Sequence, residues 1–157
     1  MRKAFLLCSA VIFSLSLFAQ QKKAEDVIKF KELTYDFGKI KQNVPATHDF
    51  LFTNVSDGAV VIESATPSCG CTTPVKPEGA IPKGKDNKIT AGFNAAAPGP
   101  FNKSITIKVA GIDVPLQLKI TGEVLTADAF TKYQQEKDKS KLSGKYVEKS
   151  IDKNKIF

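Results

Sequence analysis

The chain is poor in the side chains on which most catalytic and metal sites depend. Its 157 residues hold one arginine, one histidine, one methionine and three cysteines, which are Arg2, His48, Met1, Cys8, Cys69 and Cys71. Nucleic-acid-binding proteins use arginine for bidentate contacts with bases and phosphates, which lysine cannot make. The net charge of +7, which comes almost entirely from lysine, therefore indicates a solvated basic surface and no nucleic-acid partner.

Familiar catalytic motifs are missing as well. The sequence contains no Walker phosphate loop, G-x-G-x-x-G run, G-x-S-x-G elbow or H-E-x-x-H pair. No internal repeat is visible either. We therefore expect a protein that is not an enzyme.

Residues 1–19 have the pattern of a secretory signal peptide. Arg2 and Lys3 precede an uncharged, mostly apolar stretch, and Ala19 offers a small residue for cleavage. An uncleaved anchor is the alternative, but the stretch is shorter than the about 18 residues of a membrane span. Cys8 follows a bulky leucine too early in the chain for lipidation. Cleavage would leave 138 residues with a net charge of +5, a single exported domain in the periplasm or outside the cell.

The segment from 28 to 124 alternates apolar and polar residues between turns rich in Gly, Pro, Asn and Asp. This pattern predicts an all-β, immunoglobulin-like sandwich of about seven strands. The expected strands cover 28–33, 35–40, 47–53, 59–65, 88–93, 102–109 and 114–123. The positions expected to face the core are Phe50, Phe52, Ile89, Ala91, Phe93, Ile105, Ile107, Val109, Val114, Leu116, Leu118 and Ile120. Pro115 cannot donate to a ladder, so we expect it on an edge strand or at a bulge.

Two polar segments flank this domain. Residues 20–27 are expected to form a loose leader. Residues 125–157 form a lysine-rich tail, in which Thr126 or Asp128 could cap a short helix through Lys139. We expect the rest of the tail to be a solvated extension, with partner docking as the alternative.

The chemistry of the chain is concentrated in Cys69-Gly70-Cys71, a CxC motif between Pro67 and Pro74. A disulfide needs Cα atoms within about 4.4–6.8 Å, so the chain must bend at Gly70, the residue best suited to do so. A ring of three residues contributes only about 1.6 kcal/mol in the loop-entropy model. The simplest reading is a passive disulfide that closes the loop.

Two other readings of the pair stay open. Cys69 and Cys71 could form a redox-active pair, with thiolates favoured by nearby Lys76. They could also bind a metal together with His48. A closed zinc site needs four ligands, so a soft ion such as Cu(I), or four thiolates pooled by two chains, would suit better. We expect His48 itself to be a strand-end residue at the rim of the core.

Several short runs resemble a bacterial family known as domain of unknown function 1573. The runs are Tyr35-Asp-Phe-Gly-Lys-Ile40, Phe50-Leu-Phe-Thr-Asn54 with Gly58, Ser68-Cys-Gly-Cys-Thr72, Ile81-Pro-Lys-Gly84, and Phe93 followed by Gly99-Pro-Phe-Asn-Lys-Ser-Ile105. The resemblance covers about residues 32–124. It implies an exported immunoglobulin-like sandwich, akin to domains of the major-sperm-protein and Hydin type, and supplies no activity, substrate or cofactor. Its members are often lipoproteins, whereas this sequence lacks a lipobox.

Together these observations predict an exported, non-enzymatic binding or scaffolding module of the cell envelope, whose partner is another envelope protein. No cofactor is expected for that role. The alternative is a thiol redox or copper-handling protein that works through Cys69 and Cys71, with Cu(I) as its ion.

Overall fold

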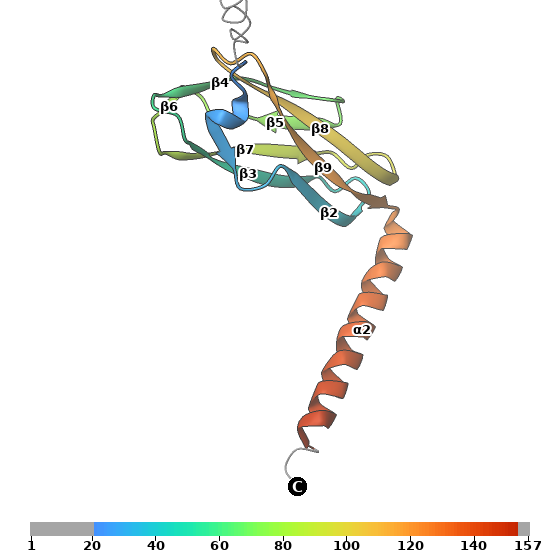
Figure 1. Ribbon diagram of the computed structural model, residues 1–157. Helices are drawn as coiled ribbons and strands as arrows, with labels where there is room; N and C mark the ends of the chain where they lie inside the picture. The colour runs from blue at the N-terminus through green and yellow to red at the C-terminus, as the bar shows by residue number, and fades with distance from the viewer. Residues whose placement is uncertain (1–20, 154–157) are drawn as a thin grey trace, which may run out of the picture.

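Two β-sheets pack face to face and are followed by a long helix (Figure 1). The computed structural model describes residues 21–153, so the predicted signal peptide and Cys8 lie outside the described residues. One sheet has the order β1 (Ile28–Phe30), β3 (Ala46–Asn54), β7 (Asp86–Phe93) and β5 (Thr72–Val75). The other has the order β2 (Thr34–Lys41), β9 (Leu116–Leu125), β8 (Gly99–Val109), β4 (Val60–Pro67) and β6 (Ala80–Ile81). The all-β, immunoglobulin-like fold is therefore confirmed.

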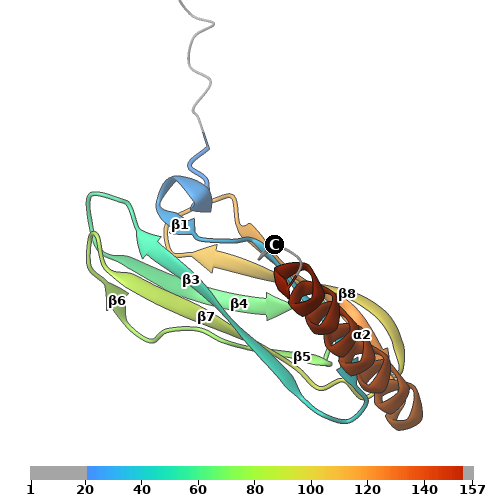
Figure 2. The ribbon, with the colours of Figure 1, turned by 90° about the horizontal axis from the view of Figure 1, so that it is seen from below.

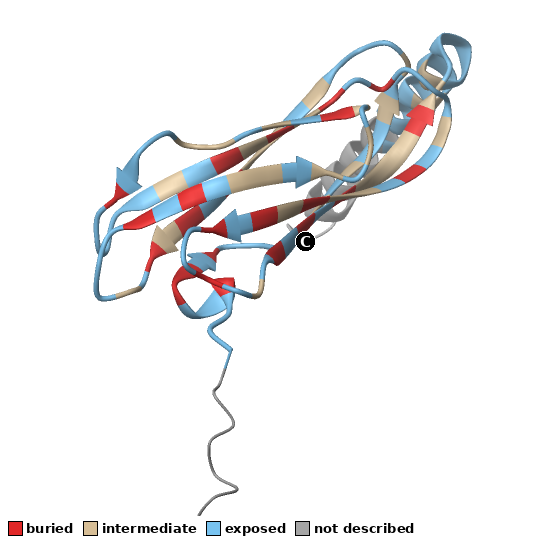
Figure 3. Ribbon diagram, turned by 90° about the horizontal axis from the view of Figure 1, so that it is seen from above, coloured by how far each residue is buried: buried red, intermediate tan, exposed pale blue. Residues whose placement is uncertain are grey.

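The core lies between the sheets, because each strand turns every second side chain inward. Buried and exposed positions alternate along the strands in Figure 3. The largest fully buried side chains are Phe50, Phe52, Ile28, Ile62, Ile89, Ile105, Ile107, Leu118, Ile120, Val109 and Val124. Of the positions predicted to face the core, only Val114 is not buried.

The strand predictions differ from the structure mainly at the ends and in number. All seven expected strands exist, but β5 and β6 were missed, because they have only four and two residues. β1 ends at Phe30, after which the chain crosses to the other sheet as β2 and pairs in parallel with β9. β9 begins at Leu116, so Pro115 precedes the ladder instead of interrupting it.

The leader is more ordered than predicted. Its 3₁₀ helix η2 (Ala24–Asp26) packs against the domain, and Ala24 and Val27 are almost completely buried. The Ala24 N–H donates to the carbonyl of Val114 at 2.9 Å. From residue 24 onward the leader is therefore part of the sandwich.

The C-terminal helix α2 (Ala127–Lys153) is longer than predicted. Thr126 caps it, as expected: its Oγ1 accepts the Ala129 N–H at 3.5 Å. The helix continues past Lys139 because the segment contains no proline and is rich in good helix formers. Both views place β6 and α2 at opposite ends of the sandwich, and α2 runs away from it (Figure 1, Figure 2). Within residues 21–153 no helix is both long and apolar enough to cross a membrane.

Candidate functional site

The cysteine turn carries the chain from one sheet to the other. β4 ends at Pro67 in the five-stranded sheet, and β5 begins at Thr72 in the four-stranded sheet, so residues 68–71 make the whole crossing. This corrects the predicted loop: Pro67 and Pro74 both lie within strands rather than outside them. A turn this short brings the two sheets together beside the cysteines.

Hydrogen bonds fix both sides of the turn. The Ser68 N–H donates to the Ser104 carbonyl at 2.8 Å, and the Ser104 N–H donates to Ser68 Oγ at 3.1 Å, which ties the turn to β8. On the other side the Asn94 N–H, just beyond β7, donates to the Cys71 carbonyl at 3.1 Å. The turn is thus held by the backbone of both sheets, independently of any bond between its sulfurs.

Cys69 and Cys71 are joined by a disulfide, with their Cα atoms 5.3 Å apart. Cys71 packs against the core, and both cysteines are partly buried. The Cys69 sulfur lies 3.6 Å from Thr72 Oγ1, a hydroxyl on a residue that is 2% exposed. The two sulfurs therefore have different surroundings: one is beside a polar donor and the other beside the core.

The chain bends between the cysteines at Gly70, as predicted, and brings their Cα atoms to 5.3 Å. The φ of Gly70 is not in the left-handed region, and a Cβ at this position would meet no atom within 4 Å outside Cys69 and Cys71. The bend between the cysteines therefore needs no glycine on steric grounds. Gly70 is itself exposed.

The free edge of β5 has no N–H to offer. The bond between Asn94 and Cys71, together with the register, directs residues 71, 73 and 75 toward β7. The backbone N–H and C=O positions of residues 72 and 74 therefore point away from β7, toward the free edge. The Thr72 N–H is taken by the Cys69 carbonyl at 3.3 Å, and proline has none. Within Thr72–Val75 this edge presents carbonyls only, so it is poorly suited to pairing with another strand.

His48 lies far from the cysteines. It lies on β3, which is separated from β5 by β7. Along the strand direction, its register position is three residues from the position level with Cys71. At about 4.8 Å per strand and 3.4 Å per residue, the Cα atoms of His48 and Cys71 are about 14 Å apart. The structure thus does not bring the three predicted metal ligands together. Among the described residues, no three His, Cys, Asp or Glu side chains gather as a ligand set.

The His48 ring joins the two sheets. It stacks on the Tyr35 ring of β2 with centroids 3.5 Å apart. It also packs perpendicular to the Phe50 ring, with centroids 4.8 Å apart. Its Nε2 is 2.8 Å from Glu32 Oε1, and its side chain is 17% exposed. The structure therefore agrees with the prediction of a strand-end histidine at the rim of the core.

Asp49, the next residue, lies on the outer face of the same strands. The Lys88 ammonium and the Thr90 hydroxyl donate hydrogen bonds to its carboxylate at 2.7 and 2.5 Å. These donors, Lys88 first, lower the pKa of Asp49. The contacts link β3 to β7 across the sheet, so we assign this carboxylate a structural role.

The lysine nearest to the cysteines in the register is Lys103, and not Lys76 as expected. Lys76 Nζ pairs with Glu78 at 3.5 Å. Pro67 pairs with Ile105 and Ser68 with Ser104, so continuing this register places Lys103 opposite Cys69, just beyond the end of β4. Lys103 is partly buried and lies on the side of β8 that Ile105 turns to the core. Sequence reasoning missed it because only the pairing of distant strands brings it to the turn.

A β-bulge shapes the sheet at this end of the molecule. The register of β2 against β9 shifts at residues 37 and 38, and Asp36 Oδ1 accepts the Gly38 N–H at 2.9 Å. Opposite the bulge, a Cβ on Gly122 would lie 2.8 Å from the Gly38 carbonyl oxygen and 2.7 Å from the Phe101 ring. Glycine is needed there because backbone and ring approach so closely.

A crevice of about 380 Å³ lies between this bulge and the first turns of α2. Phe37, Lys39, Phe130, Tyr133 and Lys137 are among its lining residues. The Lys39 ammonium sits 5.0 Å from the centre of the Tyr133 ring, and the Lys137 ammonium 5.9 Å. The crevice therefore combines aromatic surface with two cations. Asp138 lines the crevice as well.

Comparison with known proteins places this fold in a family. The family described as "Protein of unknown function (DUF1573)" matches residues 28–124. The chain belongs to this family. A search of curated proteins found no match.

Solved structures share the fold of this DUF1573 protein at low identity. A protein of unknown function from Porphyromonas gingivalis W83 is 16% identical with a TM-score of 0.53, over 71% of this chain and 50% of that one. This chain thus spans about half the length of the Porphyromonas protein. The ASH / PapD-like domain of human CEP192 is 9% identical with a TM-score of 0.52, over 71% of this chain and 92% of that domain. These likenesses support the fold alone.

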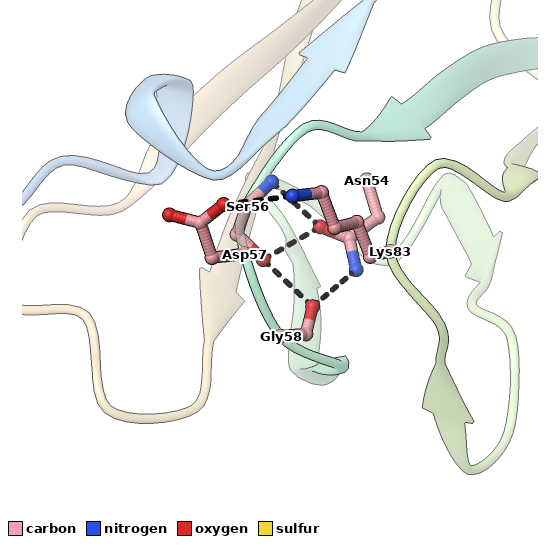
Figure 4. A network of polar contacts seen from close by, with 5 residues as sticks. All are labelled: Asn54, Ser56, Asp57, Gly58 and Lys83. Carbon is pink, nitrogen blue, oxygen red and sulfur yellow. Dashed lines mark hydrogen bonds and ion pairs between the residues drawn. The ribbon is translucent and has the colours of Figure 1, made fainter.

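One family-like run of the DUF1573 domain forms a buried polar network, away from the cysteines (Figure 4). Asn54 is fully buried, and its Nδ2 donates to the carbonyls of Gly58 and Ile81, each at 2.8 Å. Its Oδ1 accepts the Ser56 N–H at 2.9 Å and the Ser56 hydroxyl at 2.7 Å. All the polar atoms of the side chain are used to join the turn after β3 to β6. We therefore regard this run as structural.

Proposed function

We propose that this DUF1573 protein is an exported, non-enzymatic binding module of the cell envelope, and that it holds another envelope protein at the α2 end of the sandwich. The crevice between the β2 bulge and α2 carries the proposal. It exposes aromatic surface and the ammonium groups of Lys39 and Lys137 at one place. Such a mixture suits recognition of a protein segment that offers apolar and acidic side chains.

The placement of the reactive side chains supports a non-enzymatic role. His48 is stacked on Tyr35 and bonded to Glu32, about 14 Å from Cys71, so it cannot serve the sulfurs as a base. Asp49 is engaged by Lys88 and Thr90. These groups are committed to contacts that hold the sheets together.

The shape of the chain supports a scaffolding role as well. At 1.5 Å per residue, the 27 residues of α2 span about 40 Å. Figure 1 shows this helix leaving the sandwich instead of lying along it. A domain with such an arm can hold a partner beside its own β-sheets.

Site-specific photo-crosslinking in cells that export the chain tests the proposal. A photoreactive phenylalanine analogue at Tyr133 should form a discrete cross-link with an envelope protein. The same analogue at Val55, beyond the far end of β3 and 48% exposed, is the matched control and should give none. Equal products from both sites, or no product at Tyr133, would refute the proposed surface.

Charge reversal provides the second arm of the experiment. Lys39→Glu combined with Lys137→Glu should reduce the Tyr133 cross-link severalfold, since both cations face the crevice. Lys108→Glu, on β8 outside the crevice, should leave the yield unchanged. A yield that survives the double reversal would show that the cations do not take part.

A further inference from the structure

The disulfide of the cysteine turn joins two partly exposed residues, and hydrogen bonds hold the turn in place without it. Gly70 between the cysteines is exposed, and Cys69 and Cys71 are both partly exposed. The turn is fixed by Ser68 to β8 and by the Cys71 carbonyl to Asn94. Opening the bond would therefore leave the two sulfurs close together on a preserved backbone. This arrangement is expected of an exchangeable bridge rather than a structural one.

We propose that Cys69–Cys71 is an exchange disulfide that accepts two electrons from a dithiol of a partner protein. The inference goes beyond the binding role, since the turn and the crevice are different surfaces of the chain. We assign Cys69 as the sulfur that the partner attacks and Cys71 as the sulfur that leaves in this first step. The assignment rests on the difference between them: Cys71 packs against the core, whereas Cys69 faces the Thr72 hydroxyl.

The exchange balances as follows. A thiolate of the partner attacks Cys69 Sγ, the Cys69–Cys71 bond breaks, and the electron pair leaves on Cys71 Sγ, which takes up a proton. The partner's second thiolate then attacks its own sulfur in the mixed disulfide and releases Cys69 as a thiolate, which is also protonated. The partner loses two electrons and two protons to become a disulfide, and the turn gains them as two thiols.

Thr72 is placed to assist the second step as a positioning residue. Its Oγ1 is 3.6 Å from Cys69 Sγ, so the hydroxyl can donate to the sulfur when Cys69 leaves as a thiolate. No comparable donor is seen at Cys71, whose surroundings in the described structure are the core and the backbone of the turn. The hydroxyl therefore acts in the second step, in which Cys69 is the leaving group, whereas the choice of Cys69 for the first attack rests on the packing of Cys71 against the core.

Two single-cysteine variants test the assignment and serve as matched controls for each other. Residues 20–157 of the chain have no cysteine besides this pair, so Cys71→Ser isolates Cys69 and Cys69→Ser isolates Cys71. With oxidised glutathione as the probe, the mixed disulfide should form at least about tenfold faster on Cys69 than on Cys71. Melting curves of both variants confirm that the fold is kept. Equal rates, or faster reaction of Cys71, would overturn the assignment.

The wild-type chain tests the exchange itself. Mixed with a synthetic dithiol peptide, the oxidised chain should gain two hydrogens in mass while the peptide loses two, and its circular dichroism should not change. A Cys69→Ser, Cys71→Ser variant should leave the peptide reduced. If the wild-type bridge reacts only after denaturant is added, the bridge is structural and the proposal is wrong.

Discussion

Replacing Asn54 with alanine should be among the most damaging single substitutions in the sandwich. The Asn54 side chain is completely buried and makes four hydrogen bonds. In the variant the Ser56 hydroxyl no longer donates to Asn54 and can donate to the Gly58 carbonyl, 2.8 Å away. The Ile81 carbonyl and the Ser56 N–H lose the partner that Asn54 supplied. Each such loss costs about 1–3 kcal/mol, so we expect about 3 kcal/mol in total, a large part of a typical stability of about 5–15 kcal/mol.

Urea unfolding of the variants measures this loss. The midpoint should fall while the slope stays unchanged, because the surface exposed on unfolding is the same. Asn54→Asp keeps the volume but removes both donors, so it should also be destabilised. Lys83→Ala is the control. It breaks the 2.8 Å ion pair between Lys83 and Asp57, two largely exposed side chains, and should not measurably shift the urea midpoint. Figure 4 shows the Lys83–Asp57 pair and the contacts of Asn54 with Ser56 and Gly58. If Asn54→Asp were tolerated, the hydrogen-bond reasoning would be refuted.

Two further predictions concern the replacement of glycines and the loss of stability at low pH. Gly122→Ala should destabilise the fold by about 2 kcal/mol, because its Cβ would meet the Gly38 carbonyl oxygen at 2.8 Å, whereas Gly70→Ala should change the melting point little. Comparable melting points for the two variants would contradict this. The pKa of Asp49 is lowered from its ordinary value of 3.8, so its contribution to stability is present above that value and is lost as the pH falls through the folded-state pKa. Asp49→Asn should therefore make the urea midpoint less dependent on pH below about pH 4, and an unchanged dependence would refute the assignment.

The fold was predictable where burial follows the period of the strand. Ile105, Ile107 and Val109 face the core as their alternation predicted, because one face of a half-buried sheet must be apolar. β5 and β6 could not be found in this way. Each is too short to show a period, and each is defined by its partner strand, β7 for one and β4 for the other.

The candidate site was predictable only in its chemistry. The CxC motif pointed to the cysteines, and the bridge between them is seen. Its surroundings depend on pairing between residues far apart in sequence. Ser104 in β8 and Asn94 just beyond β7 hold the turn from its two sides, and the register places Lys103 opposite Cys69 while Lys76 pairs with Glu78. Local spacing contains no information about such neighbours.

The backbone of the turn also limits how a partner can be recognised. The Cys69 carbonyl accepts the Thr72 N–H, and Pro74 has no N–H. The outer edge of β5 therefore cannot complete an antiparallel ladder. A polypeptide that reaches the disulfide therefore cannot be held there by strand addition along Thr72–Val75. It must be recognised through side chains, either at the turn itself or at the crevice beside α2. For this reason the sulfurs can be exposed next to a sheet edge without making that edge a site of aggregation.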